Sequence, residues 1–231
     1  MTMLRWDYRT SLVELEDQVL TFGRWAESMV PSAMDALTQG SEEQARQMLQ
    51  RDDDLDIGIE AVEAKVVELL TLQAPVAEDM RLLLSLQKIA RSVERIGDHC
   101  VNIGRLGAEL AGVEGADGAE GADGQLVDQM HELGRRAERA VRTGLDCFSQ
   151  RRPDGVDRVE QVEAQLDQLH EGLTSRLIEH ATTGRAATHW AVRMVLASRQ
   201  LERIGDHAVG IAESGAFVAS GTRRRPRGQR G

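Results

Sequence analysis

The sequence predicts an all-α protein made of two homologous antiparallel three-helix bundles, with six long helices in total. Three observations support this prediction. Aromatic residues make up 3% of the 231 residues and proline occurs four times, a composition that favours helix over sheet. The hexapeptide ERIGDH occurs at residues 94–99 and again at 202–207, which indicates an internal repeat. Apolar residues with heptad spacing surround both copies.

Three helical segments are expected in the first half of the chain. The first covers about 7–38, with a kink or local break at Pro31. The second covers about 41–72, because Ser41 followed by two glutamates suits a helix start. The third covers about 75–110 and opens on a proline, a residue favoured at the first turn of a helix.

The second half repeats this order after a glycine-rich segment. Helices are expected over about 125–149, 154–182 and 186–218, with a break at Gly184. The segment GVEGADGAEGADG has five glycines and no apolar periodicity, which is typical of a flexible linker. The predicted organisation is therefore a first repeat at 1–111, a linker at 112–124, a second repeat at 125–219 and a basic disordered tail at 220–231.

The third helix of each half has the clearest pattern. Its apolar residues alternate between steps of four and three, and the same steps recur at the equivalent places around the second hexapeptide, which predicts the same buried seam in both halves. The seam residues are Leu82, Leu86, Ile89, Val93, Ile96, Cys100 and Ile103, followed by Trp190, Met194, Ala197, Leu201, Ile204, Ala208 and Ile211. A single elongated six-helix bundle is the alternative to two separate bundles.

Charge and composition limit the function classes. The formal net charge is −10, so binding to nucleic acid is not expected, because phosphate contacts need a basic surface. Two cysteines fit a reducing compartment rather than a disulfide framework. The N-terminus lacks an apolar signal region, and no stretch of about 20 apolar residues occurs. We therefore expect a cytoplasmic protein that reaches a membrane only through its partners.

The repeated hexapeptide places two carboxylates on the outer side of its helix. Glu94 and Asp98 follow seam positions by one and two residues and are four apart, so they lie on one stripe. Glu202 and Asp206 repeat the pair in the second copy. Two carboxylates at this spacing repel each other by a few tenths of a kcal/mol. The second helix of each half has a similar acidic pair: Asp52 with Asp56, and Glu163 with Asp167.

Two interpretations of these acidic pairs remain open at this point. Arg91, Arg95, Arg199 and Arg203 each precede one of the carboxylates by three residues, so local ion pairs could compensate the charge. Alternatively, carboxylates from two neighbouring helices suit a cation that prefers oxygen ligands, such as iron, magnesium, manganese or calcium. The histidine of each hexapeptide is expected to pack or to form a hydrogen bond rather than to bind metal.

These motifs resemble the PhoU family. The string LQAPVAEDMRLLLSLQKIARSVERIGDHCVNI at 72–103 is similar to the family's third helix, and RQLERIGDHAVGIAE at 199–213 is similar to its second copy. The resemblance implies two three-helix bundles with multinuclear metal clusters, of iron or zinc, on their surfaces; magnesium and manganese are alternatives. Carried over by position, the ligands are Glu94, Asp98, Glu202 and Asp206, with Asp52, Asp56, Glu163 and Asp167 on the second helices. Glu163 replaces a common Asp, and Gly210 stands where the first copy has Asn102, so the second site is expected to be the weaker.

The resemblance also implies a function. PhoU proteins are cytoplasmic negative regulators of the phosphate-starvation response, which connect a phosphate ABC transporter and its ATPase to a sensor histidine kinase. We therefore expect a homodimeric, non-enzymatic regulator of phosphate homeostasis with these partners. A metal-free helical adaptor is the alternative. A di-iron carboxylate enzyme is disfavoured, because its Glu-x-x-His pairs are absent from the sequence.

Overall fold

The structure is a computed structural model that describes residues 2–72, 75–111 and 122–222. Within these ranges the chain is helical and contains no strand, as predicted. The predicted linker and tail lie largely outside the described residues. The first helix continues through Pro31, so the local break expected there is wrong. The helices are α1 (Thr2–Gln39), α2 (Glu42–Leu72), α3 (Ala77–Ala111), α4 (Gly124–Ser149), α5 (Gly155–Ala181) and α6 (Arg185–Ser220).

Local chemistry explains several helix ends. The Ser41 hydroxyl accepts a hydrogen bond from the backbone N–H of Gln44 at 3.2 Å, which confirms Ser41 as a helix start. The Asp123 carboxylate caps α4 in the same way, accepting from two backbone N–H groups. Gly40 and Gly221 have left-handed φ angles of 64° and 73° and end α1 and α6. The caps at Gly40 and Ser41 let the chain reverse direction between α1 and α2.

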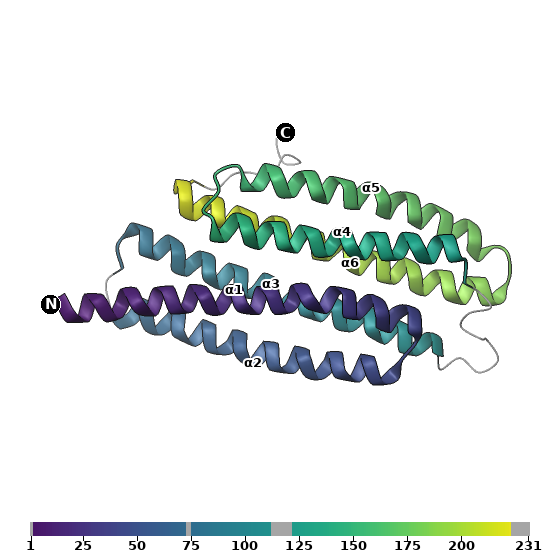
Figure 1. Ribbon diagram of the computed structural model, residues 1–231, viewed down its shortest axis with the longest axis horizontal. Coiled ribbons are helices and arrows are strands. Elements are labelled where there is room, and N and C mark those ends of the chain that lie inside the picture. The colour runs from purple at the N-terminus through teal and green to yellow at the C-terminus, as the bar shows by residue number, and fades with distance from the viewer. Residues whose placement is uncertain (1, 73–74, 112–121, 223–231) are drawn as a thin grey trace.

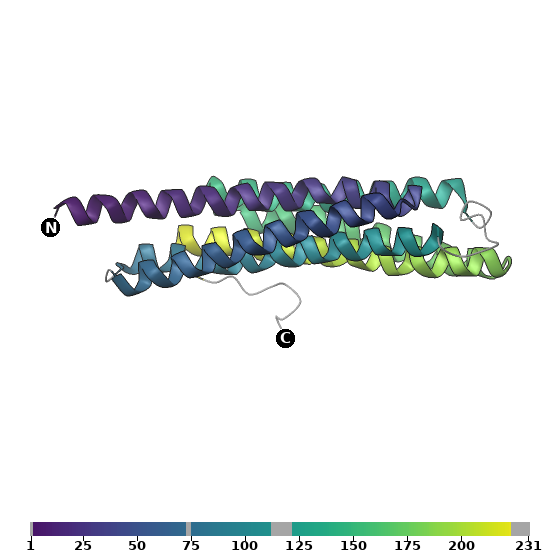
Figure 2. The same cartoon turned by 90° about the horizontal axis from the view of Figure 1, so that it is seen from below.

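The six helices form two three-helix bundles that lie side by side (Figure 1). Helices α1, α2 and α3 make the first bundle, and α4, α5 and α6 make the second. The bundles meet along α3 with α6 and along α1 with α4, whereas α2 and α5 lie on the outside. Figure 2 shows α1 and α4 on one side of the elongated molecule and α3 and α6 on the other. The structure therefore has features of both predicted alternatives, two separate bundles and one elongated six-helix bundle. It has two three-helix bundles that pack against each other along one long contact.

The predicted seam is buried in both repeats. Every seam residue is buried except Leu82, which is partly buried beside the fully buried Leu83. The buried side chains of both bundles form one continuous apolar core. Within the described residues, no helix combines the length and the apolar character that crossing a membrane would require.

The two copies of ERIGDH lie side by side in the middle of the contact between α3 and α6. The rings of His99 and His207 are 5.5 Å apart. His99 Nδ1 lies 2.7 Å from the side-chain oxygen of Gln200. Further along the same contact, the Lys88 ammonium donates to the Glu213 carboxylate at 3.1 Å. Because residue numbers rise on one helix as they fall on the other, the helices are antiparallel, and an approximate two-fold axis passes near the histidines.

Candidate metal centres

The structure brings the predicted acidic residues together in two clusters. We define the first acidic cluster as Asp52 and Asp56 of α2 with Glu94 and Asp98 of α3. The second acidic cluster consists of Glu163 and Asp167 of α5 with Glu202 and Asp206 of α6. Each cluster therefore joins the second and third helices of one repeat, which agrees with the pairing predicted from the sequence.

Asp52 is the most buried carboxylate of the first acidic cluster. Its exposed fraction is 8%, and its Oδ1 atom is buried with no hydrogen-bond partner. Burial and the charges of Asp56 and Asp98 raise the pKa of Asp52 to about 7. A buried carboxylate oxygen without a partner is costly in free energy unless a proton or a cation compensates it.

Gly97 of the hexapeptide makes the burial of Asp52 possible. A Cβ atom added at residue 97 would overlap the Oδ1 atom of Asp52 and would lie 3.0 Å from Cδ2 of Leu55. The absence of a side chain lets α2 approach α3 at this point. The glycine of the repeated hexapeptide therefore makes room for the acidic side chain of the neighbouring helix.

The other members of the first acidic cluster also repel one another. Burial and then the charges of Asp98, Asp53 and Glu60 raise the pKa of Asp56. Burial raises the pKa of Glu94, which Arg95 partly offsets. Glu94 and Asp98 are partly buried beside α2 rather than fully outward as predicted.

The second acidic cluster shows the same electrostatics without a fully buried member. Burial, a charge interaction and a hydrogen bond with Asp167, and the charge of Asp206 raise the pKa of Glu163 to about 7. Burial and then Glu202 and Asp167 raise the pKa of Asp206, and Arg203 offsets part of this. The nearby Glu160 contributes to the pKa of Glu163 and has a buried Oε2 atom without a hydrogen-bond partner. Sequence reasoning missed Glu160, although it precedes Glu163 by one helical turn.

The predicted local ion pairs form only in part. Arg95 donates to Asp98 at 3.0 Å, as expected. Arg91 instead pairs with Glu63 of α2 at 3.2 Å, so its expected pairing with Glu94 is wrong. In the second repeat, no ion pair involves Arg199 or Arg203 among the residues that the structure describes. Of the predicted local ion pairs, Arg95 with Asp98 therefore forms in the described ranges, and the arginines only partly offset the repulsion among the other carboxylates.

The clusters fit an oxygen-bound cation in residue type and charge, but their side chains do not form a complete ligand set. Within the described ranges, no three His, Cys, Asp or Glu side chains are arranged to hold one metal ion as they stand. The unpartnered Oδ1 of Asp52, the room left at Gly97 and the raised carboxylate pKa values are nevertheless features that a cation would satisfy. To bind a cation, the carboxylates would have to rotate toward it. Asp98 would then interact with both the cation and Arg95.

A family comparison decides the relationship of the chain to known proteins. The model of the PhoU domain matches the chain twice, at residues 19–106 and 130–215. The chain belongs to the PhoU family. The two matches fall inside the repeats proposed at 1–111 and 125–219, and each includes one copy of ERIGDH.

Relatives and solved structures agree with this assignment. The chain is 27% identical over 220 residues to a "Phosphate-specific transport system accessory protein PhoU homolog" of Clostridium acetobutylicum, covering 95% of this chain and 97% of that one. A homolog of the same name from Caulobacter vibrioides is 28% identical over 227 residues, covering 95% and 94%. The crystal structure of PhoU from Pseudomonas aeruginosa matches with a TM-score of 0.83 at 26% identity, covering 93% of this chain and all of that chain. These names describe accessory proteins rather than enzymes, in agreement with the prediction.

Proposed function

We propose that the chain is a cytoplasmic accessory protein of a phosphate transport system and a negative regulator of the phosphate-starvation response. The observation that supports this proposal most strongly is the double match to the PhoU domain, together with relatives named as phosphate transport accessory proteins over nearly the whole chain. The proposed partners are the ATPase of a phosphate ABC transporter and a sensor histidine kinase. In this proposal the chain couples the two and favours the phosphatase output of the kinase when phosphate is plentiful, so that the response regulator stays inactive.

The acidic clusters are the proposed metal sites of this regulator. Each would hold a multinuclear cluster of iron or zinc, with magnesium or manganese as alternatives, through the carboxylates of one repeat. The bound cations would neutralise the like charges and satisfy the unpartnered oxygen of Asp52. Because bound metal stabilises the folded state by mass action, loss of metal would lower the melting temperature.

A genetic complementation experiment tests the regulatory role. The gene is deleted, and a reporter of the phosphate-starvation response is measured in phosphate-replete cells. The proposal predicts high reporter output in the deletion strain and normal repression after wild-type complementation. The variant Asp52→Asn/Asp98→Asn should restore repression only in part, and Arg139→Gln on exposed α4 should restore it fully. Normal repression in the deletion strain would contradict the regulatory role.

A metal-free helical adaptor is the second candidate function. The ion pair between Arg95 and Asp98 and the lack of a three-ligand arrangement in the described part of the chain favour it. This candidate shares the fold and the partners but assigns the acidic clusters no cation. Elemental analysis of tag-free protein distinguishes the two, since the adaptor would contain no bound iron or zinc.

A further inference from the structure

Large apolar side chains are exposed at equivalent places in the two repeats. Val67 of α2 and Leu84 of α3 are 58% and 42% exposed, and Ile178 of α5 and Val192 of α6 are 60% and 50% exposed. Val67 and Ile178 are separated along the chain by the same offset as the equivalent acidic residues of α2 and α5. Leu84 and Val192 are separated by the same offset as the two copies of ERIGDH. A single exposed apolar residue is ordinary, but the same exposed pair in both repeats indicates a use.

The exposed residues of the second repeat lie at the same level along the neighbouring helices α5 and α6. Gly205 of α6 lies against Leu166 and Glu163 of α5, and these helices are antiparallel neighbours. Val192 precedes Gly205 by about 20 Å along the helix axis, at a rise of about 1.5 Å per residue. Because α5 runs antiparallel to α6, the same distance along α5 from Glu163 and Leu166 leads to residues 176–179. This range includes Ile178. Leu196, one turn beyond Val192, is 46% exposed. We define the α6 patch as Ile178, Val192 and Leu196.

Arginines flank the α6 patch on both sides. Arg185 begins α6, and Arg199 and Arg203 follow Leu196 by three and seven residues, so all three share the exposed stripe of Val192 and Leu196. All three arginines are exposed. None of them forms an ion pair within the ranges that the structure describes. The stripe is therefore apolar in its middle and positively charged at its ends, in a chain whose net charge is −10.

The equivalent stripe on α3 provides an internal contrast. Its basic residues are already neutralised by carboxylates of the same chain, so it has little charge to offer a partner. The pairs are Lys88 with Glu213 at 3.1 Å, Arg91 with Glu63 at 3.2 Å, and Arg95 with Asp98 at 3.0 Å. The α6 patch therefore combines exposed apolar side chains with unpaired arginines, and its counterpart on α3 does not.

We propose that the α6 patch and its flanking arginines bind an acidic amphipathic helix of a partner protein. Apolar anchors at helical spacing would pack on Val192, Leu196 and Ile178, as in helix-in-groove recognition. Carboxylates on either side of these anchors would pair with the guanidinium groups, which donate bidentate hydrogen bonds to carboxylates. Glu202 and Asp206 of the second acidic cluster lie on either side of Arg203 in the sequence. They repel further carboxylates, so the bound helix ends at Arg203.

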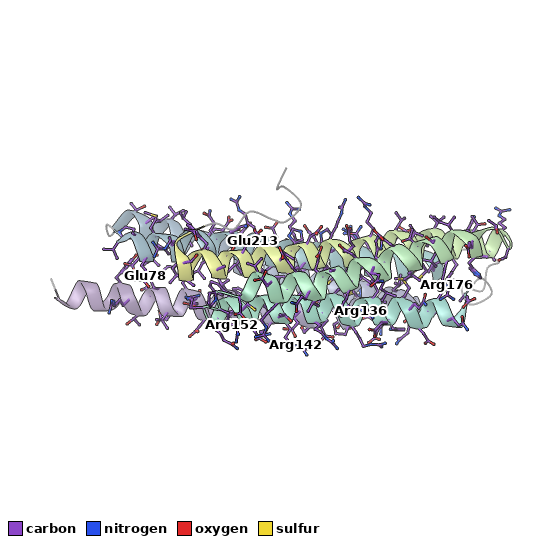
Figure 3. All side chains as sticks on the ribbon, turned by 90° about the horizontal axis from the view of Figure 1, so that it is seen from above. Glu78, Arg136, Arg142, Arg152, Arg176 and Glu213 are labelled. Atoms are coloured by element: carbon purple, nitrogen blue, oxygen red, sulfur yellow. The ribbon has the colours of Figure 1, made fainter. Side chains whose placement is uncertain are left out.

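The location of the patch suits a partner that approaches from one side. Helix α6, which carries the stripe, lies on the side of the molecule formed by α3 and α6 (Figure 2). Figure 3 shows Glu213 on this side and Arg142 on the opposite side, along α4. An exposed arginine of α4, such as Arg139, is therefore a charge-matched control for variants of the stripe.

Binding measurements with purified proteins test this inference, which rests on the proposed function for the identity of the partner. The full-length chain is titrated with the ATPase of the same organism's phosphate transporter and with the cytoplasmic part of its sensor kinase. We expect Arg199→Glu/Arg203→Glu to weaken binding to one of them about tenfold or more, and Leu196→Asp to do the same. Arg139→Glu should change the affinity less than about twofold. Leu196→Asp and Arg139→Glu should keep the wild-type melting temperature because these residues are exposed. The fold of Arg199→Glu/Arg203→Glu is checked by circular dichroism, because Arg203 offsets part of the repulsion around Asp206.

Each outcome distinguishes the inference from the proposed function. If the wild type binds a partner and the stripe variants bind equally well, the docking surface is wrong while the function stands. If the wild type binds neither protein, the proposed partners are wrong and the docking inference is overturned with them. If Leu196→Asp converts a dimer into a monomer in sedimentation without affecting partner binding, the patch is a contact between copies, and the inference is also overturned.

Discussion

Gly97 and Gly205 occupy the same place in the two hexapeptides, and replacing each by alanine gives a matched test of the close helix contact. A Cβ at Gly97 would overlap Oδ1 of Asp52 and lie 3.0 Å from Leu55. A Cβ at Gly205 would lie 3.4 and 3.6 Å from the Leu166 side chain, an ordinary contact. The same substitution therefore has different consequences in the two repeats.

The expected magnitudes follow from two opposing effects. Alanine in a helix interior is more stable than glycine by about 0.5–1 kcal/mol, which applies to both variants. Overpacking costs about 1–3 kcal/mol and applies only to Gly97→Ala. We therefore expect Gly205→Ala to be neutral or stabilised, and Gly97→Ala to be less stable than Gly205→Ala by about 1–3 kcal/mol. For a chain of this size, this corresponds to a melting temperature lower by about 2–12 °C.

Thermal unfolding by circular dichroism, with and without a chelator, measures this difference. The difference between the variants should persist in chelator, because overlap with Asp52 does not require metal. If the first acidic cluster holds metal as proposed, Gly97→Ala should also bind less of it without chelator, since the Asp52 carboxylate is displaced. Equal melting temperatures for the two variants would refute the close contact between α2 and α3 at Asp52.

Two further predictions concern buried carboxylates. In metal-free protein, the pKa of Asp52 is raised from 3.8 to about 7, so the folded state holds this proton more tightly than the unfolded state. The free energy of unfolding should then fall as pH rises from about 4 to 7. Denaturant titrations at several pH values measure this dependence, and Asp52→Asn should weaken it. An unchanged pH dependence in Asp52→Asn would contradict the raised pKa of Asp52. Glu27 is buried on α1 and accepts from Arg24 at 2.9 Å and from Arg142 of α4 at 2.6 Å. Glu27→Ala should cost about 1–3 kcal/mol, measured by calorimetry, with Arg139→Ala as the exposed control; an unchanged melting temperature would show that this network does not stabilise the contact between the bundles.

Much of the fold could be predicted because long helices leave a strong periodic signal. The heptad seam around Val93 and Leu201 identified the third helices and their buried faces, and Ser41 marked the start of α2. The contact between the bundles could not be predicted in the same way. It depends on which helix faces meet after each bundle has formed, and the pairing of α3 with α6 leaves no local pattern in the sequence.

The candidate site was predicted in its members but not in its details. The acidic pairs recur at fixed offsets, so their residues could be named from the sequence alone. The burial of Asp52 depends on the missing side chain of Gly97 on another helix, which spacing along α2 does not reveal. Likewise, Arg91 pairs with Glu63 across two helices, although Glu94 is nearer in the sequence.

The metal content of tag-free protein tests the central claim most directly. Iron and zinc are measured per chain by elemental analysis after purification without a histidine tag. We expect more than one equivalent in the wild type, and loss of this metal when Glu94, Asp98, Glu202 and Asp206 are replaced by alanine. Wild-type protein that binds no metal under any condition would contradict the claim that the two acidic clusters are metal sites.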